Sequence, residues 1–144
     1  MWGQATQTAL WPLLKLQKRS IRTICNLRNR DSTMPSFHKL KILRLPDIYR
    51  FSILVFMYKY KNNLLPATFD KFYQENKDFH RYPTRGASNL RPPKVKSKLS
   101  NSFIRKAGVL LWNEFSPKII HHINFNIGSF KRQIKGLFIN KYLE

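Results

Sequence analysis

Cysteine is nearly absent from this sequence of 144 residues, because only Cys25 occurs. One cysteine cannot form an internal disulfide, and it cannot supply the paired thiolates of a structural zinc site. The sequence therefore predicts a protein of a reducing, intracellular compartment. Cys25 falls on the apolar stripe of a predicted helix, so we expect a small buried side chain rather than a nucleophile.

Acidic residues are also few, since 7 Asp and Glu stand against 27 Lys and Arg. They are scattered singly, whereas acid–base catalysis needs two ionisable groups in one pocket and two-metal phosphoryl transfer needs paired carboxylates. His121 and His122 are sequence neighbours whose side chains would diverge in most regular structure, which argues against a metal site. We therefore expect a chain that by itself is no enzyme, with no catalytic residue, no metal and no cofactor.

Glycine is scarce, and none of the five glycines belongs to a phosphate-cradling loop of the G-x-x-x-x-G-K or G-x-G-x-x-G type. Long apolar runs are missing as well. The longest, Ile53–Tyr58, is far shorter than the roughly 20 residues of a membrane-spanning helix. Residues 1–6 lack the charged start and apolar stretch of a signal peptide. We expect neither a nucleotide-binding loop nor a membrane partner.

Positive charge dominates what is present, with a formal net charge of +20. Six of the basic residues lie between Met1 and Arg30 and eight between Phe79 and Leu111, and neither window contains an acid. An A/T-rich gene would also raise the lysine number, so the position of the charge is stronger evidence than its amount. Two acid-free basic windows predict a surface that attracts RNA or DNA.

Apolar residues recur mostly at helical spacing, which predicts a mainly α-helical fold. Pro12 and Pro46 suit the first turns of two helices, and Ser129 is a candidate N-cap of a third. The expected helices span 12–27, 37–43, 46–61, 66–74 and 129–142, with a helix or a strand at 109–115 and a new turn at Pro117.

No composition break divides the chain, so we expect a single unit over 1–144. Its parts would be a helical part at 1–78, a basic extended segment at 79–106, and a tryptophan-containing element with a C-terminal helix at 107–144. A short β-hairpin near 89–105 is one interpretation of the basic segment, with strands near Asn89 to Arg91 and near Phe103 to Arg105.

The expected core contains Leu14, Ile21, Val55 and Phe130, and Trp112 is assigned to packing. The middle of the 46–61 helix is apolar on every side. A helix of that kind has to be enclosed, either within this fold or by a partner.

Two sets of basic residues are candidates for contact with nucleic acid. One set shares a flank of the first predicted helix, and the other alternates with Phe79, Tyr82, Leu90 and Phe103, an arrangement that can pair phosphates with stacked bases. An ordinary solvated basic surface is the alternative for both. The sets are Lys15, Lys18, Arg19 and Arg22, and Arg81, Arg85, Arg91, Lys94, Lys96, Lys98, Arg105 and Lys106.

Several short motifs occur together in a family-like order. They are Trp2-Gly3, Leu14-x-Leu16-Gln17-Lys18-Arg19-x-Ile21-Arg22, Leu45-Pro46-Asp47, Phe56-Met57-Tyr58-Lys59, Asn62-Asn63-Leu64-Leu65-Pro66, Tyr82-x-Thr84-Arg85, Gly108-x-x-x-Trp112-Asn113 and Phe130-Lys131. In this order and spacing the chain resembles, over almost its whole length, the C-terminal tail of reverse transcriptases from non-LTR (LINE-like) retrotransposons. Phe115-Ser116-Pro117 departs from the Leu-Pro that is more usual there.

The resemblance implies a post-palm, thumb-like region of an RNA-directed DNA polymerase that helps to hold template RNA and target DNA. The palm that binds catalytic metal would lie upstream, so no catalytic residue carries over. It further implies the upstream polymerase domain as a possible partner, and an intracellular location in nucleus and cytoplasm. Two alternatives stay open: an interaction module that docks through its apolar central helix, and a decayed retroelement remnant with no selected role.

Overall fold

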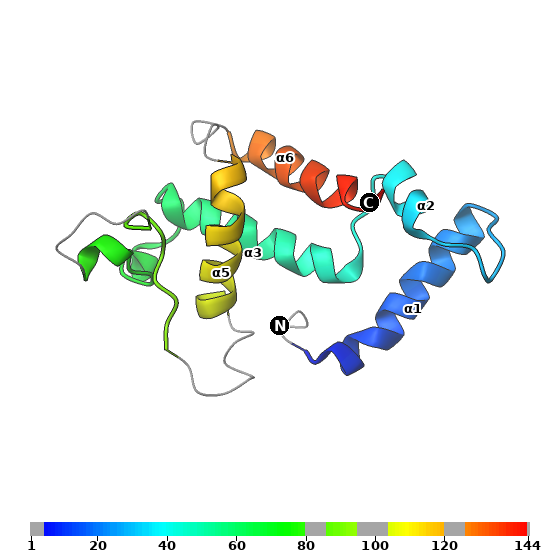
Figure 1. Ribbon diagram of the computed structural model, residues 1–144, viewed down its shortest axis with the longest axis horizontal. Coiled ribbons are helices and arrows are strands. Elements are labelled where there is room, and N and C mark those ends of the chain that lie inside the picture. The colour runs from blue at the N-terminus through cyan, green and yellow to red at the C-terminus, as the bar shows by residue number, and fades with distance from the viewer. Residues whose placement is uncertain (1–4, 80–85, 95–103, 120–125, 144) are drawn as a thin grey trace. The chain divides into compact units, whose positions relative to one another are not determined.

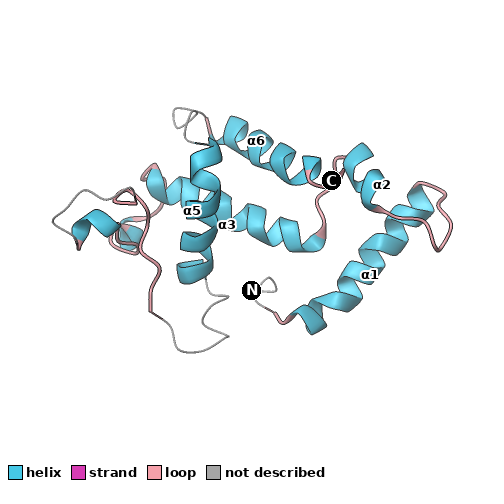
Figure 2. Ribbon diagram, viewed as in Figure 1, coloured by secondary structure: helices cyan, strands magenta, loops and turns pink. Residues whose placement is uncertain are grey.

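The computed structural model describes residues 5–79, 86–94, 104–119 and 126–143, and this part of the chain is mainly helical. The ribbon in Figure 1 follows its helices along the chain, and Figure 2 shows them joined by loops, with no strand in the described ranges. The expected fold class is confirmed. Within the same ranges, no helix has the length and apolar character that crossing a membrane requires.

Packing divides the chain into two compact units, which composition does not mark. Unit 1 combines residues 1–51 with 128–144, and unit 2 contains residues 52–127. The division falls within helix α3, Leu45–Lys61.

The first helix of unit 1, α1, spans Gln7–Ile24 and begins earlier than the sequence predicts. Thr6 is its N-cap, and the Thr6 hydroxyl accepts a hydrogen bond from the Ala9 N–H at 3.3 Å. Pro12 therefore lies inside the helix rather than in its first turn. Pro12 and Thr8 are both exposed, so water can satisfy the Thr8 carbonyl that loses its helical donor.

One side of α1 packs on the start of α3. Leu14 and Ile21 are buried as expected, and between them Gln17 donates from Nε2 to the Leu43 carbonyl and accepts from the Leu45 N–H, both at 2.9 Å. The predicted apolar stripe is wider than this contact. Leu13 and Ile24 are exposed, at 48% and 65%, and Cys25 is only half-buried.

The core of unit 1 includes residues of α2, Met34–Lys39, of α6, Ile127–Asn140, and of the turn that follows α6. Phe37 is fully buried and meets the Tyr142 ring edge-on, with centroids 6.3 Å apart. Phe130 is buried as predicted. Ser129 is not the N-cap of α6, because the helix already begins at Ile127.

Unit 2 contains the rest of α3 and the helix α5, Ile104–Ile119. Ile53, Leu54 and Met57 are buried on α3, whereas Val55, which we expected in the core, is only half-buried. The apolar middle of α3 is thus largely covered by the chain itself.

Between α3 and α5 the described residues include two short 3-10 helices, η2 at Ala67–Phe69 and η3 at Asn76–Asp78. The helix expected over 66–74 is wrong in length, because only η2 is helical there. In contrast, α5 is longer than expected: it includes Arg105, passes the half-buried Trp112 and holds Pro117 near its end.

The hairpin near 89–105 is absent from the described residues. Ile104 and Arg105 begin α5 instead of forming a strand, and Leu90 makes an isolated antiparallel bridge with Glu75. The strand expected near Asn89 to Arg91 is therefore reduced to this single bridge, and its partner lies upstream rather than near 103–105. A bridge depends on tertiary contact, which local sequence does not specify.

Candidate nucleic-acid interface

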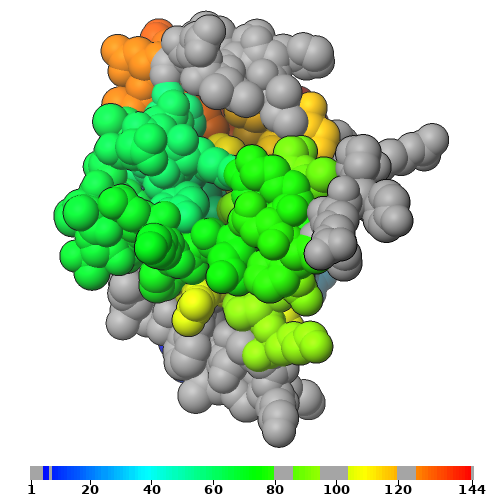
Figure 3. Space-filling model, turned by 90° about the vertical axis from the view of Figure 1, so that its left-hand side faces the viewer, coloured from blue at the N-terminus to red at the C-terminus, as the bar shows by residue number. Residues whose placement is uncertain are grey.

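A groove of about 220 Å³ opens on the surface of unit 2. It is built from the turns after η2, the end of η3, the stretch 91–94 and the first turn of α5. In Figure 3 the yellow-green surface of residues 86–94 adjoins the green surface of the residues before position 80. Its lining contains three cations and no carboxylate: Phe72, Tyr73, Gln74, Phe79, Arg91, Pro92, Pro93, Lys94 and Arg105.

One wall of the groove is a stacked pair of Phe79 and Arg91. The Arg91 Cζ lies 4.0 Å from the centroid of the Phe79 ring, which places the guanidinium over the ring face. Phe79 is 49% exposed, so the pair lies at the surface. A guanidinium held on an aromatic ring keeps its charge and has less conformational freedom to lose when it binds an anion.

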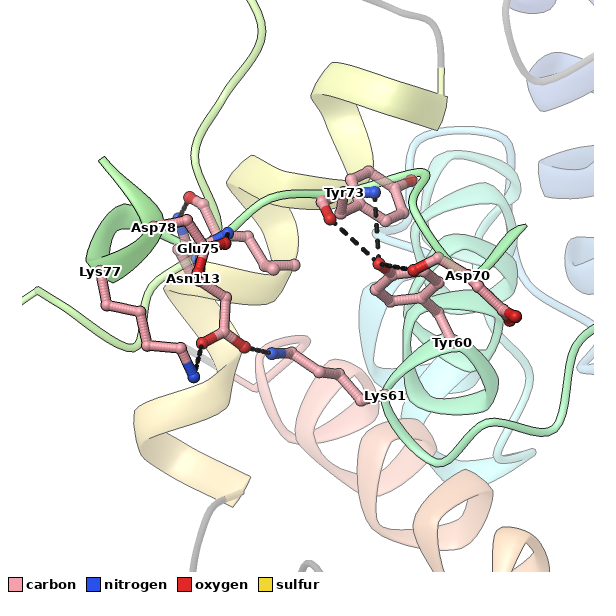
Figure 4. A network of polar contacts seen from close by, with 9 residues as sticks. Tyr60, Lys61, Asp70, Tyr73, Glu75, Lys77, Asp78 and Asn113 are labelled. Atoms are coloured by element: carbon pink, nitrogen blue, oxygen red, sulfur yellow. Dashed lines mark hydrogen bonds and ion pairs between the residues drawn. The ribbon is translucent and has the colours of Figure 1, made fainter. Parts of the chain in front are cut away.

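The backbone that carries Arg91 is held by α5. Asn113 accepts from the Leu90 N–H at 3.1 Å and donates from Nδ2 to the Leu90 carbonyl at 2.8 Å, so its amide replaces a neighbouring strand (Figure 4). The Arg91 N–H donates to the Gln74 carbonyl at 2.8 Å. Leu90 itself is buried, at 1% exposure, and does not face a ligand as the predicted alternation implied.

A second part of the lining pairs Phe72 with Arg105, whose Cζ lies 5.4 Å from the ring centroid. The Tyr73 hydroxyl donates to the Ile104 carbonyl at 2.9 Å, which fixes the start of α5 beside Phe72. Burial of this hydroxyl raises the pKa of Tyr73, with the Tyr60 charge adding and Arg105 opposing, so Tyr73 stays a neutral donor.

Glu75 lies beside this region but is already paired (Figure 4). Its carboxylate receives Lys61 Nζ at 2.5 Å and Lys77 Nζ at 2.7 Å. The hydrogen bond from Lys61, followed by that from Lys77, lowers the pKa of Glu75. Within the described ranges, no carboxylate lies within ion-pair distance of Arg91, Lys94 or Arg105. The groove therefore keeps its positive charge.

The predicted set on α1 forms a separate patch on unit 1. Lys15 and Lys18 both approach the Trp11 ring, with Nζ 5.6 and 5.8 Å from its centroid, and Trp11 is 46% exposed. Arg19 is exposed. Arg22 instead donates to the Asp31 carbonyl at 3.4 Å, so part of its hydrogen-bonding capacity serves the loop after α1.

Of the eight basic residues predicted in 79–106, the structure brings Arg91, Lys94 and Arg105 together. Lys106 lies on α5 but does not line the groove. The segment is not uniformly extended, because its last residues belong to a helix. Arg81, Arg85, Lys96 and Lys98 lie outside the described residues, as do Tyr82, Phe103, His121 and His122.

Phe72 is the residue that sequence reasoning missed. It precedes the acid-free window, and the turns that carry it were expected to be helical. The signal available was the aromatic cluster itself: Phe72 meets Phe69 edge-on at 5.5 Å and Tyr73 at 4.9 Å. An aromatic cluster of that kind does not distinguish a core from a surface before its packing is known.

Among the described residues, no three His, Cys, Asp or Glu side chains are grouped so that they could hold a metal ion.

Comparison with family models, curated proteins and solved structures finds no significant match to this chain.

Proposed function

We propose that this chain is a non-catalytic module that binds RNA or DNA without strong sequence preference. The observation that carries the proposal is the groove of unit 2, in which Arg91, Lys94 and Arg105 gather without a carboxylate among the lining residues. Cations of this kind contact phosphate, which positions a nucleic acid but carries no base information. The patch of Lys15 and Lys18 beside Trp11 adds a second basic surface.

The resemblance to the tail of non-LTR retrotransposon reverse transcriptases supports a more specific form of the proposal. In that form the chain is the post-palm, thumb-like region of such a polymerase and helps to hold template RNA and target DNA. The two elements that contribute most to the resemblance fit this role, because α1 carries the basic patch and Asn113 of α5 holds the backbone of Arg91 in place.

Neutralising the groove tests the binding. A triple variant, Arg91→Gln, Lys94→Gln and Arg105→Gln, removes three positive charges from one site. A matched control, Lys131→Gln, Arg132→Gln and Lys135→Gln, removes three charges from exposed positions of α6. Filter binding to a mixed-sequence RNA should show a loss on the order of 100-fold for the groove variant. Equal losses in the two variants would mean that net charge, rather than the groove, attracts RNA.

The origin of the chain needs a different experiment. Mapping the 5′ end of the transcript that covers Met1, and reading the frame upstream, should reveal a continuous frame with a polymerase domain and paired metal-binding aspartates. A transcript whose translation begins at Met1 would instead favour a free-standing retroelement remnant.

The interaction-module alternative keeps less support. It needs an exposed apolar surface on α3, but Ile53, Leu54 and Met57 are buried there. Phe56, which is half-buried, meets the Phe69 ring at 5.6 Å.

A further inference from the structure

The lining of the groove distinguishes between kinds of polyanion, and this inference rests on the proposed function. A site for phosphate alone would need only cations. Here two of the three cations lie over aromatic rings, Arg91 over Phe79 and Arg105 over Phe72. Both pairs line the same groove, so flat surfaces and positive charges lie next to one another.

Flat surfaces beside cations match a ligand that combines planar bases with phosphates. Aromatic rings and guanidinium planes stack on nucleobases, and neighbouring cations contact the phosphates that join them. In a double helix the bases are stacked on one another and present only their edges in the grooves. A stacking surface can therefore receive bases from an unpaired strand only.

The Phe79–Arg91 pair is positioned before any ligand arrives. Phe79 directly follows η3, and its N–H donates to the Asn76 carbonyl at 3.1 Å. At the other end of η3, Glu75 and Asp78 form reciprocal side-chain to backbone hydrogen bonds. Arg91 follows Leu90, whose N–H and carbonyl are both hydrogen-bonded to the Asn113 amide. Side chains fixed in this way lose less entropy on binding.

We propose that this groove binds single-stranded nucleic acid, with unpaired bases stacked on the Phe79–Arg91 and Phe72–Arg105 pairs and Lys94 contacting phosphate. The pair of Phe79 and Arg91 contributes most of the preference, because its contact is closer and Phe79 is half-exposed. Stacking does not distinguish ribose from deoxyribose, so the affinities for unpaired RNA and unpaired DNA of one sequence lie within a few-fold of each other.

The test compares a single strand with a strand of equal phosphate number that lacks bases, and with a duplex in which the bases are paired. The full chain is titrated by filter binding with a mixed-sequence single strand, with an abasic strand of the same length, and with the duplex of the same sequence. Wild type should bind the base-containing single strand about 5- to 100-fold more tightly than either the abasic strand or the duplex, which is the range that stacking of one base supplies. Equal binding of the normal and abasic strands would overturn the stacking proposal.

Two variants keep the charge and remove the stacking surface. Phe79→Leu should lower affinity for the normal single strand by about 5- to 100-fold and leave affinity for the abasic strand unchanged. Arg91→Lys should act in the same direction, since an ammonium keeps the charge but offers no plane. Arg132→Lys on α6 is the matched control and should change nothing. If both stacking variants keep the wild-type preference, the pair is only a packing feature.

The two proposals fail in different ways. If the triple neutralisation of Arg91, Lys94 and Arg105 weakens all ligands but the abasic strand binds as well as the normal one, the groove binds polyanions and stacking is refuted. If that triple variant binds every ligand as wild type does, the proposed function itself fails. Circular dichroism of each variant excludes unfolding as the cause, and Phe79 is exposed enough for substitution to leave the core intact.

Discussion

At the scale of single residues, the hydroxyl of Tyr142 joins two polar groups at and just before the start of α3. It donates to Asp47 Oδ2 at 2.7 Å and accepts from the Arg44 N–H at 3.1 Å, and Asp47 is only 8% exposed. Asp47 also stands in the first turn of α3, where a negative charge complements the helix dipole. One oxygen thus connects the C-terminal end of the chain to the start of α3.

Tyr142→Phe should therefore lower the free energy of unfolding by about 1–3 kcal/mol, because it leaves a buried carboxylate oxygen and a backbone N–H without their partner. Urea unfolding followed by circular dichroism measures the change. Adding Asp47→Ala should cost less in the Tyr142→Phe background than in wild type. Strict additivity of the two substitutions would show that the bond contributes nothing.

Glu75 links stability to pH. Its pKa is lowered in the folded state by Lys61 and Lys77, so the folded protein holds the ionised form more strongly than the unfolded chain does. The resulting stabilisation is complete above the ordinary carboxyl pKa and is lost as pH falls through the lowered value.

Glu75→Gln should reduce the free energy of unfolding by about 1 kcal/mol at pH 7, and the difference from wild type should shrink as pH falls below about 4. Unfolding titrations at pH 7 and at pH 3 measure it. Asp70→Asn removes an exposed charge and serves as the control. A difference that is the same at both pH values would exclude the ion pairs as its cause.

At the scale of elements, the close contact of α3 with α5 requires a residue without a side chain, Gly108, on α5. A Cβ added at Gly108 would lie 2.8 Å from Met57 Sδ and 2.9 Å from the Tyr73 hydroxyl oxygen. Met57 can adjust, but Tyr73 is held by its bond to the Ile104 carbonyl. On α6, a Cβ at Gly136 would meet nothing within 4 Å.

Replacing glycine by alanine should consequently change the free energy of unfolding in opposite directions in α5 and α6. Gly108→Ala should destabilise by about 1–3 kcal/mol through overpacking, despite the better helix propensity of alanine. Gly136→Ala should stabilise by up to about 1 kcal/mol, because only the propensity changes. Thermal and urea unfolding of both variants provide the measurement. Stabilisation by Gly108→Ala would show that α3 and α5 do not meet so closely.

Local sequence predicted those elements whose signals are local. The start of α3 followed from Pro46 and Asp47, and it begins at Leu45 as expected within one residue. The helix boundaries expected at Pro12 and Pro117 are wrong, because both prolines are exposed inside helices, where one lost hydrogen bond is tolerated.

The candidate site was predicted only in part, for a related reason. Charge pattern alone picked out Arg91, Lys94 and Arg105. It could not show that Leu90 turns inward, because the partners of Leu90 are Glu75 and Asn113, which are distant in sequence. Pairing across such distances depends on the assembled fold.

At the scale of the whole molecule, a net charge of +20 does not state how many cations contact phosphate. About six contacts would give a slope of about −4 to −5 for the logarithm of affinity against the logarithm of salt concentration. Titrations of wild type over a range of salt concentrations measure this slope. The groove triple variant should reduce its magnitude by about 2 to 3, and an unchanged slope would place the contacts elsewhere.

The surroundings of Trp11 give the molecule an optical reporter. The indole is half-exposed, and the ammonium groups of Lys15 and Lys18 lie close enough to polarise its excited state. An anion that draws these lysines away changes the fluorescence emission. The sequence has only three tryptophans, so replacing Trp2 and Trp112 by Phe would leave a signal that reports occupancy of the α1 patch alone. The two basic surfaces can thus be distinguished in one titration, because tryptophan fluorescence reports the α1 patch and total binding reports both surfaces together.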